Sequence, residues 1–471
     1  MARTLSKAIE ETCRRNASNI AIYANTGEAI RYDDYFGCVL AFAEIVNSLG
    51  IKQGQCVSYR IADETVISIL RLALLRLGVI AIEGSAKILR EKYSVQVDHY
   101  FYDEPTFSDD TVNSTRVDNG WLRPPTKISP IYPDGKLVFA SSGTTGLPKL
   151  RVFDDEQLHA RAGWSDKLRW IPSGNVFVGY RSAAFPAFTR MTRTFAAGLS
   201  VVQPRADWEK SLAAISKYDA TDLYLSGFQY LKLLETMVAT RARLPNLRIV
   251  AVGGSPISYS VASLGEEVFN CPVINTYGSS ETGGISHCRT TDYPDEAGCV
   301  GHPYKNIECK LADITQELLI RPPRQLVPRN FPEMSEVADS DGWIHTGDIG
   351  NFKADGTLYI VGRLSELINS GGNKYSPTEF EETARRFDGV KDVTAFAVNS
   401  PNGDQIAGVA IKADPDFDIH LFSAGMQDRF GKTCMMQIAV VHDFVYSKSG
   451  KIDRNAMSDM FGKALESQSG Q

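Results

Sequence analysis

Apolar and polar positions along the first part of the chain predict alternating strands and helices. Short apolar runs at residues 20–23, 56–61 and 79–83 predict strands, and longer amphipathic stretches at 32–49 and 64–77 predict helices that end at glycines. Strands that alternate with helices in this way are typical of an α/β domain with a largely parallel sheet.

The pattern changes at two places. Residues 103–135 lose their periodicity and contain five prolines, which predicts a loop or connector. Alternation resumes at Lys136, with further strands expected at residues 200–203, 222–225, 249–252 and 273–276. After a strand expected at 357–362, a turn-rich stretch leads to a helix with an N-cap at Ser376 and a proline at its first position. We therefore expect two domains, residues 1–362 and residues 363–471.

Composition and charge narrow the class of protein. Apolar residues make up 43% and charged residues 23%, as in soluble globular proteins. The net charge of −6, without a run of five like charges, argues against a nucleic-acid partner. Eight scattered cysteines without a C-x-x-C pair indicate a reducing compartment. The apolar stretch 66–82 contains Arg71 and Arg76, which favours a buried helix over a membrane span. We expect a cytoplasmic protein that binds no membrane.

Residues 137–153, LVFASSGTTGLPKLRVF, contain a cluster suited to phosphate. The cluster comprises Ser141, Ser142, Gly143, Thr144, Thr145 and Gly146, and Lys149 follows it. Glycines let backbone N–H groups approach oxygens, hydroxyls add donors, and the lysine supplies charge. A Walker loop would place Ser or Thr directly after the lysine and then begin a helix, whereas residues 150–153 predict a strand. Taken alone, the stretch fits a phosphate cradle or a plain turn.

Four later segments contain groups that suit a nucleotide. NTYGSSETGG (275–284) offers the ring of Tyr277 for a base, and Glu281 for Mg²⁺ held together with phosphate oxygens. GWIHTGDIG (342–350) places Asp348 in an expected tight turn, where its carboxylate could accept both ribose hydroxyls. YIVGRLSELINSGGNKYSPTEFEE (359–382) places Arg363 at a strand end, and SKSGKIDR (447–454) places Lys451 behind a glycine.

These five segments, in this order, resemble those of the adenylate-forming superfamily, which includes acyl- and aryl-CoA synthetases, adenylation domains and firefly luciferase. The resemblance covers nearly the whole chain. It implies an α/β fold with a large N-terminal domain of α/β subdomains plus a β-barrel-like part, and a small mobile α+β C-terminal domain. It also implies that ATP and Mg²⁺ activate an acid to an acyl-adenylate with release of pyrophosphate. The acyl group would then pass to the thiol of CoA or of a phosphopantetheinyl carrier protein.

The resemblance assigns roles to individual residues. Lys451 would bridge the acyl carboxylate and the α-phosphate, and it forms the implied catalytic set with Glu281, the magnesium ligand, and Thr144. A cation there would stabilise the charge that develops on phosphate during attack. The other implied nucleotide contacts are Ser141, Ser142, Gly143, Thr145, Gly146, Lys149, Gly254, Ser255, Pro256, Asn275, Thr276, Tyr277, Gly278, Ser279, Ser280, Asp348, Ile360 and Arg363.

The resemblance also places a hinge at Ser365, where the family usually has Asp or Lys, and a thiol-facing segment at Gly371 and Gly372. Two further departures are Leu150, where a glycine is common, and Asn369, where a lysine is frequent. None of these differences removes a group on which the adenylation step depends.

The acid is expected to occupy a pocket that includes Phe185, Gly253, Gly278 and Gly283. The segment SAAFPAF (182–188) lacks the Asp of α-amino-acid-activating domains and the His of many acyl-CoA synthetases, so an aryl or acyl acid is expected. The nearby arginines are expected to be solvated, although they could receive a second carboxylate; they are Arg181, Arg190 and Arg193.

CoA is the favoured acceptor because it is the commonest in the superfamily, and a free-standing carrier protein is the alternative. Two other classes of function are less consistent with the sequence. A non-catalytic nucleotide-binding relative would not need Lys451, Glu281 and Asp348, and a P-loop phosphotransferase would need a different phosphate loop.

Overall fold

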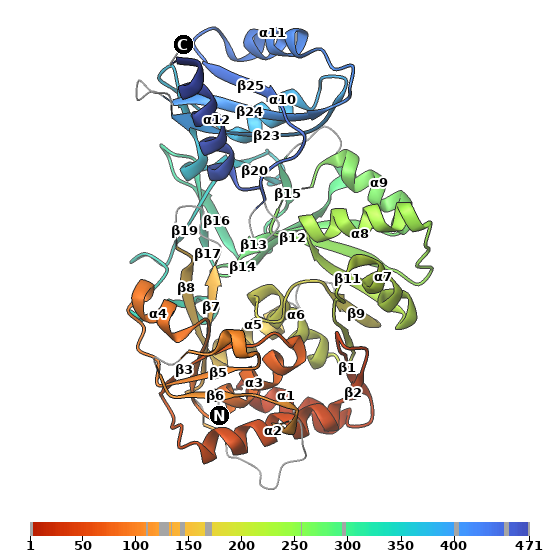
Figure 1. The fold of residues 1–471 in the computed structure, drawn as a ribbon, viewed down its shortest axis with the longest axis vertical. Helices are drawn as coiled ribbons and strands as arrows, with labels where there is room; N and C mark the ends of the chain where they lie inside the picture. The colour runs from red at the N-terminus through yellow and green to blue at the C-terminus, as the bar shows by residue number, and fades with distance from the viewer. Residues whose placement is uncertain are drawn as a thin grey trace. The chain divides into compact units, whose positions relative to one another are not determined.

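The computed structural model describes residues 3–109, 112–121, 131–132, 134–141, 147–164, 172–255, 257–293, 298–399, 405–446 and 452–469 (Figure 1). The chain divides by its internal contacts into two compact units. Unit 1 comprises Met1–Pro294, His302–Glu308 and Ile320–Ile344. Unit 2 comprises Asp295–Gly301, Cys309–Leu319 and His345–Gln471.

Unit 1 contains a seven-stranded sheet with the order β18-β8-β7-β4-β3-β5-β6. Its strands are β3 (Cys56–Arg60), β4 (Ile80–Glu83), β5 (His99–Tyr102), β6 (Ser114–Arg116), β7 (Lys136–Ser141), β8 (Lys149–Asp154) and β18 (Arg329–Asn330). The strands from β7 to β6 in this order pair in parallel, whereas β8 is antiparallel to both β7 and β18. The sheet is therefore largely parallel, as the sequence predicts.

An eight-stranded sheet forms the other half of unit 1, in the order β14-β13-β12-β11-β9-β10-β1-β2. Its strands are β1 (Ile20–Tyr23), β2 (Ala29–Arg31), β9 (Asn175–Val178), β10 (Val201–Val202), β11 (Ala220–Ser226), β12 (Ile249–Gly253), β13 (Val273–Ser279) and β14 (Gly283–Arg289). The six strands β1, β10, β9, β11, β12 and β13 pair in parallel, and the hairpins β1–β2 and β13–β14 are antiparallel.

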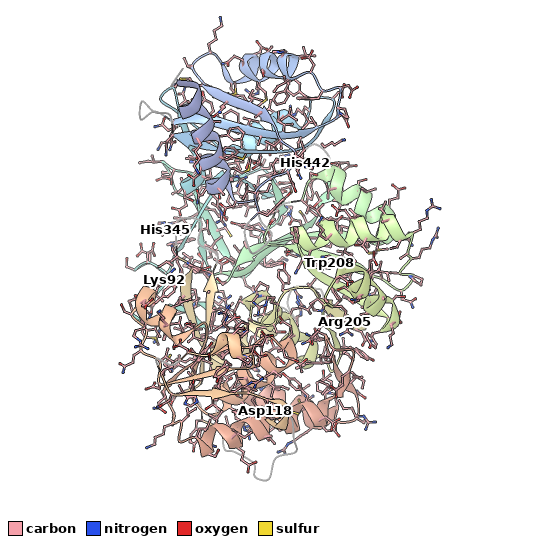
Figure 2. The ribbon with its side chains drawn as sticks, viewed as in Figure 1. Lys92, Asp118, Arg205, Trp208, His345 and His442 are labelled. Carbon is pink, nitrogen blue, oxygen red and sulfur yellow. The ribbon has the colours of Figure 1, made fainter. Side chains whose placement is uncertain are left out.

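Helices cover both faces of the eight-stranded sheet. One hydrophobic core unites it with the seven-stranded sheet through α1 (Leu5–Arg15), α2 (Tyr32–Ser48), α3 (Glu64–Arg76), α5 (Asp155–Trp164) and α6 (Phe185–Ala196). On its other face lie α7 (Trp208–Lys217), α8 (Gly227–Thr240) and α9 (Tyr259–Phe269). Figure 2 labels Trp208, the first residue of α7. Its side chain packs against that second core. A short helix, α4 (Ala86–Tyr93), follows β4.

Local sequence explains where several of these helices begin. The carboxylate of Asp63 accepts hydrogen bonds from the backbone N–H groups of Thr65 and Val66 at the start of α3. Ser226 and Gln229 form a capping box at the start of α8. Such caps satisfy N–H groups that have no partner inside the helix.

The apolar stretch around α3 is buried inside unit 1, as predicted. Every residue from Thr65 to Arg76 is buried. Arg71 donates hydrogen bonds to the carbonyls of Ser182 and Ala183, at 3.1 and 2.7 Å, and Arg76 pairs with Glu10 at 2.7 Å. No helix in the described ranges is long and apolar enough to cross a membrane.

Unit 2 contains a five-stranded sheet with the order β15-β20-β19-β17-β16. Its strands are β15 (Cys299–Gly301), β16 (Glu308–Leu311), β17 (Glu317–Arg321), β19 (Ile344–Phe352) and β20 (Leu358–Arg363). A 3₁₀ turn, η6 (Leu364–Glu366), leads to the hairpin of β21 (Ile368–Ser370) and β22 (Asn373–Tyr375).

The C-terminal part of unit 2 is a small α+β layer. Its sheet has the order β23-β24-β25, from β23 (Val390–Asn399), β24 (Gln405–Ala413) and β25 (Met436–Val440). One face packs on α10 (Pro377–Ala384) and α11 (Ile419–Phe430), and the other packs on α12 (Arg454–Ser469). The predicted cap is present, since the Ser376 hydroxyl accepts a hydrogen bond from the Thr378 N–H.

The α/β fold class and the strands and helices predicted in the first 85 residues are confirmed. The prediction for residues 103–135 is wrong in part, because β6 pairs in parallel with β5 inside this stretch. Two 3₁₀ turns flank it, η1 (Pro105–Phe107) and η2 (Asn119–Trp121). Since β6 is an edge strand with mostly exposed side chains, it needs no apolar alternation, and the sequence shows none.

Candidate active site

The two ends of the predicted phosphate loop are held together by the β7–β8 hairpin. Ser141 pairs with Lys149 across the two strands, and the Ser141 hydroxyl donates a hydrogen bond to the Lys149 carbonyl at 3.1 Å. Lys149 is exposed, and β8 follows it directly, so the predicted strand is confirmed and the helix of a Walker loop is absent at this position. Residues 142–146, the predicted contacts of the loop itself, lie outside the described residues.

Glu281 lies in the turn of the β13–β14 hairpin. Ser279 pairs with Gly283 across that hairpin, and the Ser279 hydroxyl accepts hydrogen bonds from the N–H groups of Glu281 and Thr282, both at 3.2 Å. A side chain at Gly278 would place its Cβ 2.1 Å from the Gly283 carbonyl oxygen, so only glycine fits there. Local hydrogen bonds and close backbone packing thus fix the turn that presents Glu281.

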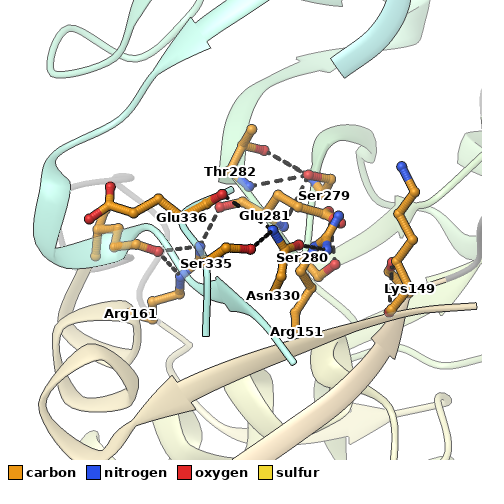
Figure 3. Close-up of polar contacts among 12 residues, drawn as sticks. Lys149, Arg151, Arg161, Ser279, Ser280, Glu281, Thr282, Asn330, Ser335 and Glu336 are labelled. Carbon is orange, nitrogen blue, oxygen red and sulfur yellow. Dashed lines mark hydrogen bonds and ion pairs between the residues drawn. The ribbon is translucent and has the colours of Figure 1, made fainter. Parts of the chain in front are cut away.

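An ion pair joins this turn to the phosphate-loop hairpin (Figure 3). Arg151 Nε donates to Glu281 Oε1 at 2.9 Å, and the Ser280 hydroxyl donates to Glu281 Oε2, also at 2.9 Å. The side chains of Arg151 and Glu281 are 9% and 16% exposed. Burial raises the pKa of Glu281, but the charge of Arg151 and the Ser280 hydrogen bond outweigh it, so the pKa is lowered overall. Glu281 is therefore an anion at neutral pH.

Arg151 also reaches a third segment of unit 1. Its Nη1 donates to the amide oxygen of Asn330 on β18, and the Asn330 amide nitrogen donates to the Ser335 hydroxyl at 2.9 Å and to the Glu336 carbonyl at 3.2 Å (Figure 3). The sequence analysis did not select Arg151. Its only signal is a position two residues after Lys149 in a strand, which places both side chains on one face.

A second arginine, Arg161, binds the main chain of the same turn. Arg161 on α5 donates from Nη2 to the Glu281 carbonyl at 2.6 Å and from Nε to the Leu326 carbonyl at 2.8 Å. Its guanidinium lies 4.9 Å from the ring centre of Phe153 and 5.2 Å from that of Phe185. Burial lowers the pKa of Arg161 to about 9, although the charge of Glu281 opposes the shift, so Arg161 stays charged at neutral pH. The sequence analysis did not select this residue either.

The predicted pocket residues Phe185 and Gly283 both lie beside Arg161. Phe185 is 8% exposed, and its ring stacks on that of Phe153 with centres 4.7 Å apart. A Cβ at Gly283 would lie 3.3 Å from Arg161 Nη1. Their role in binding an acid stays a prediction.

The predicted adenine turn lies at the ends of neighbouring strands. Gly253 of β12 pairs with Thr276 of β13, and the Thr276 hydroxyl donates to the Val252 carbonyl at 3.0 Å. Gly254 follows with a φ of +79°, which favours glycine. Asn275 is buried, whereas Tyr277 is half-buried. Ligands of open α/β sheets bind at the carboxyl ends of the strands, which is where these residues lie. Ser255 continues the turn, and Pro256 lies outside the described residues.

The ribose residues expected in unit 2 form an ion pair. Arg363 Nε lies 2.7 Å from Asp348 Oδ1, and the two residues pair across β19 and β20. The prediction of a tight turn at Asp348 is wrong, because β19 continues through it. Polar residues around a glycine are typical of a turn, and Gly347 does have a φ of +72°. The segment is nevertheless a strand, because β19 is hydrogen-bonded to β20 on one side and to β17 on the other. Ile360 lies on the neighbouring strand β20.

The residues expected to form the hinge and the thiol-facing segment are also described. Ser365 lies in η6, and Gly371 and Gly372 form the turn of the β21–β22 hairpin with φ values of +60° and +80°. Two positive φ values are what a tight two-residue hairpin requires. Lys451 lies outside the described residues.

Comparison with known proteins shows which family has this sequence. Residues 82–324, more than half of the chain, match the model of the AMP-binding enzyme family. This chain belongs to the AMP-binding enzyme family. The matched range contains the phosphate-loop hairpin, the Gly253–Gly254 turn and Glu281, and it confirms the resemblance inferred from the motifs.

Relatives of this AMP-binding enzyme include two kinds of ligase. The chain is 24% identical over 454 residues to 2-succinylbenzoate–CoA ligase of Listeria monocytogenes, covering 92% of this chain and 95% of that protein. It is 28% identical over 259 residues to the fatty acid–[acyl-carrier-protein] ligase MmaC of Mycobacterium marinum, covering 48% of each.

Solved structures share the fold of this AMP-binding enzyme. The o-succinylbenzoate CoA synthetase of Bacillus subtilis, in complex with its acyl-adenylate intermediate, superposes with a TM-score of 0.81 at 17% identity, covering 98% of this chain and 99% of that one. ATP-bound MatB from Rhodopseudomonas palustris gives a TM-score of 0.85 at 17% identity, covering 99% and 100%.

The three arginines near the expected acid pocket of this AMP-binding enzyme differ in exposure. Arg181 is 63% exposed and pairs with Glu64 and Glu83, as expected for a solvated residue. The prediction is wrong for Arg193, which is 4% exposed, and for Arg190, which is half-buried with its Cζ 3.4 Å from the ring centre of Tyr224. The physical reason is helical spacing: residues three apart share a face of α6, and this face packs on the sheet.

Proposed function

We propose that this protein is an ATP-dependent acid–thiol ligase. It activates an aryl or acyl carboxylic acid to an acyl-adenylate with release of pyrophosphate, and then transfers the acyl group to a thiol, for which we favour CoA. The observation that carries the proposal is the 2.9 Å contact between Arg151 and Glu281. It brings together two motifs that lie 130 residues apart in the chain, the phosphate-loop hairpin and the Glu281 turn.

The chemistry of the Glu281 turn fits Mg²⁺. Mg²⁺ is commonly held by one or two carboxylates together with substrate phosphates and water. Glu281 supplies one ionised carboxylate, and Ser280 supplies a hydroxyl beside it. The described residues contain no group of three His, Cys, Asp or Glu side chains that could hold a metal alone, which agrees with phosphate oxygens supplying the remaining ligands. When bound, the ion would neutralise charge on the departing pyrophosphate.

The remaining steps rest on the family resemblance. Lys149 and residues 141–146 would hold the β- and γ-phosphates, and Tyr277 would stack on adenine beside the Gly253–Gly254 turn. Asp348 and Arg363 would bind the ribose hydroxyls, and Lys451 would bring a positive charge to the α-phosphate as the acid attacks. Ser365 would act as the hinge between a domain of residues 1–362 and a domain of residues 363–471, and Gly371 and Gly372 would face the thiol.

The acceptor is proposed from the relatives. The CoA ligase of Listeria monocytogenes matches over 95% of its length. Two carrier-protein ligases match over less of theirs: MmaC of Mycobacterium marinum over 48%, and ScoC of Streptomyces coeruleorubidus over 69%. We therefore favour CoA and keep a free-standing carrier protein as the second candidate. Thioester formation measured with CoA and with a phosphopantetheinylated carrier protein distinguishes the two.

Carboxylate-dependent exchange of labelled pyrophosphate into ATP tests the adenylation step. We expect exchange with at least one member of a panel of aryl and acyl acids. Lys451→Ala should lose at least about 100-fold of it, because a positioned charge at a transferring phosphoryl group contributes several kcal/mol to the barrier. Lys391→Ala, an exposed lysine paired with Asp414 on the surface of unit 2, is the control and should keep full exchange.

Two outcomes would reject the proposal. A non-catalytic nucleotide-binding protein would bind ATP but show no exchange with any acid. A phosphotransferase would form ADP and an acyl or other phosphate without incorporating pyrophosphate.

A further inference from the structure

Arg190 presents a charge that no described residue of the protein neutralises. In the part of the chain that the structure describes, its guanidinium makes no hydrogen bond and no ion pair, and its Nη1 is buried. The guanidinium lies over the ring of Tyr224, with Cζ 3.4 Å from the ring centre. A cation–π contact contributes about 0.5–2 kcal/mol and does not replace the acceptor that a buried N–H needs.

The carboxylate that lies near Tyr224 is already engaged elsewhere. Asp222, two residues earlier on β11, accepts from Arg248 Nη2 at 3.1 Å and from the Thr221 hydroxyl at 2.5 Å. Arg193, 4% exposed, adds a second positive charge close to Tyr224 on the same face of α6. Among the described residues near Tyr224, positive charge therefore exceeds negative charge.

Three tyrosines lie close enough to Arg190 to feel its charge. Its charge acts on the phenols of Tyr180, Tyr224 and Tyr304, since it opposes the rise that burial causes in each pKa. His287 Nδ1 lies 2.9 Å from the Tyr304 hydroxyl. An arginine among phenols and an imidazole is a polar group within an otherwise aromatic wall, which suits a charged substituent on an apolar acid.

This cluster adjoins the strand ends where the acid is expected. The Tyr180 hydroxyl donates to the carbonyls of Leu225 and Gly253, at 2.8 and 3.2 Å. Gly253 pairs with Ser226 on one side and with Thr276 on the other, and Thr276 pairs with His287. Tyr224 lies two residues before Ser226, so it shares the face of the sheet with Gly253, Thr276 and His287. The residues between the aromatic groups on this face are small.

We propose that the acid activated here is a dicarboxylic acid, whose second carboxylate binds Arg190 over the ring of Tyr224. This inference rests on the proposed function, because it names the substrate class of that same site. Arginine binds carboxylates through two parallel hydrogen bonds, and a guanidinium that has no protein acceptor can offer both. The reacting carboxylate would be the other one, directed toward the nucleotide.

The test compares each free diacid with its own monomethyl ester in the pyrophosphate-exchange assay. The probes are succinate, adipate, suberate and terephthalate, each beside its half-ester, so that only one charge differs within a pair. We expect the preferred diacid to exceed its half-ester by about tenfold to a hundredfold in kcat/KM, the size of a charge-assisted hydrogen bond to a carboxylate. Equal kcat/KM values within every active pair would overturn the inference while leaving the ligase activity in place.

Substitutions at Arg190 test whether this residue binds the second carboxylate. Arg190→Gln should abolish the preference through a higher KM for the diacid, with exchange on the half-ester changed by less than about threefold. Arg190→Lys keeps the charge and should keep part of the preference, whereas Arg181→Gln, exposed and in the same segment, should keep all of it. Equal losses on both members of a pair in Arg190→Gln would contradict a role in recognition.

A binding measurement separates failure of this inference from failure of the proposed function. If no acid supports exchange, the ligase proposal fails, and calorimetric binding of the same pairs without ATP tests Arg190 by itself. Tighter binding of a diacid than of its half-ester, lost in Arg190→Gln, supports the anion site. Equal binding of both members rejects it.

Discussion

Three arginines of unit 1 differ in whether the protein supplies a hydrogen-bond acceptor for them. Arg151 and Arg161 are bound by groups of the protein, including the Glu281 carboxylate, the Asn330 amide and the Leu326 carbonyl. Arg190 rests on an aromatic ring and, within the described ranges, has no acceptor. Arg161 and Arg190 both lie against aromatic rings, so an aromatic neighbour alone does not distinguish the two roles.

The difference separates a positioning role from a binding role. Arg151 binds the side chain of Glu281 and Arg161 binds its main-chain carbonyl, so groups of the protein already accept hydrogen bonds from both arginines. Removing a partner from such a pair leaves a buried charge without compensation. Nη1 of Arg190 is buried and has no acceptor among the described residues, so its compensation would come from a ligand. Substituting methionine in both places tests this distinction, because methionine keeps most of the apolar stem.

The largest effect is expected for Arg151→Met. This variant leaves the Glu281 carboxylate buried without a counter-charge, and we expect the free energy of unfolding to fall by about 3 kcal/mol in urea denaturation. The double variant Arg151→Met/Glu281→Gln should recover part of the stability, because it removes both charges, but it should lack pyrophosphate exchange, because Glu281 no longer supplies a carboxylate for Mg²⁺. Equal stabilities of wild type and Arg151→Met would mean that the pair contributes nothing.

The pH dependence of exchange should show a smaller effect. The pKa of Glu281 is lowered in the folded protein, so its ionised form contributes stability above the unfolded pKa, and this is lost as the pH falls through the folded value. Without Arg151 that pKa rises, and the fall of exchange at acid pH should move to higher pH by about one unit. Arg190→Met should leave this acid limb where it is, since Arg190 is not among the groups that shift the pKa of Glu281.

The smallest effect is expected for the stability of ligand-free Arg190→Met. The variant loses the cation–π contact with Tyr224 but also removes a buried N–H that has no acceptor among the described residues, so the free energy of unfolding should change by no more than about 1 kcal/mol. In wild type a bound diacid should raise the melting temperature, and in the variant it should not. A loss as large as that of Arg151→Met would show that Arg190 has a structural role and would remove the contrast between the two groups.

Many features of the fold and of the candidate site depend on residues that are close together in the sequence, and these features were predicted correctly. The strand after Lys149, the cap at Ser376 and the buried helix around Arg71 follow from periodicity, turn chemistry and spacing within a few residues. The motif around Glu281 behaves likewise, since Ser279 and Thr282 organise its turn from within.

What the sequence alone determined is the family and the order of its chemistry-bearing segments, because each segment has its own short pattern. Only the tertiary structure decided which arginine meets which partner. Arg151 reaches Glu281 across 130 residues, and Asp348 lies in a strand that is hydrogen-bonded to neighbours on both sides. On α6, Arg193 is buried and the guanidinium of Arg190 lies over the ring of Tyr224. These outcomes depend on which faces of helices and sheets pack together. A pattern of polar and apolar positions does not state whether a charge will find its partner in the protein or in a ligand.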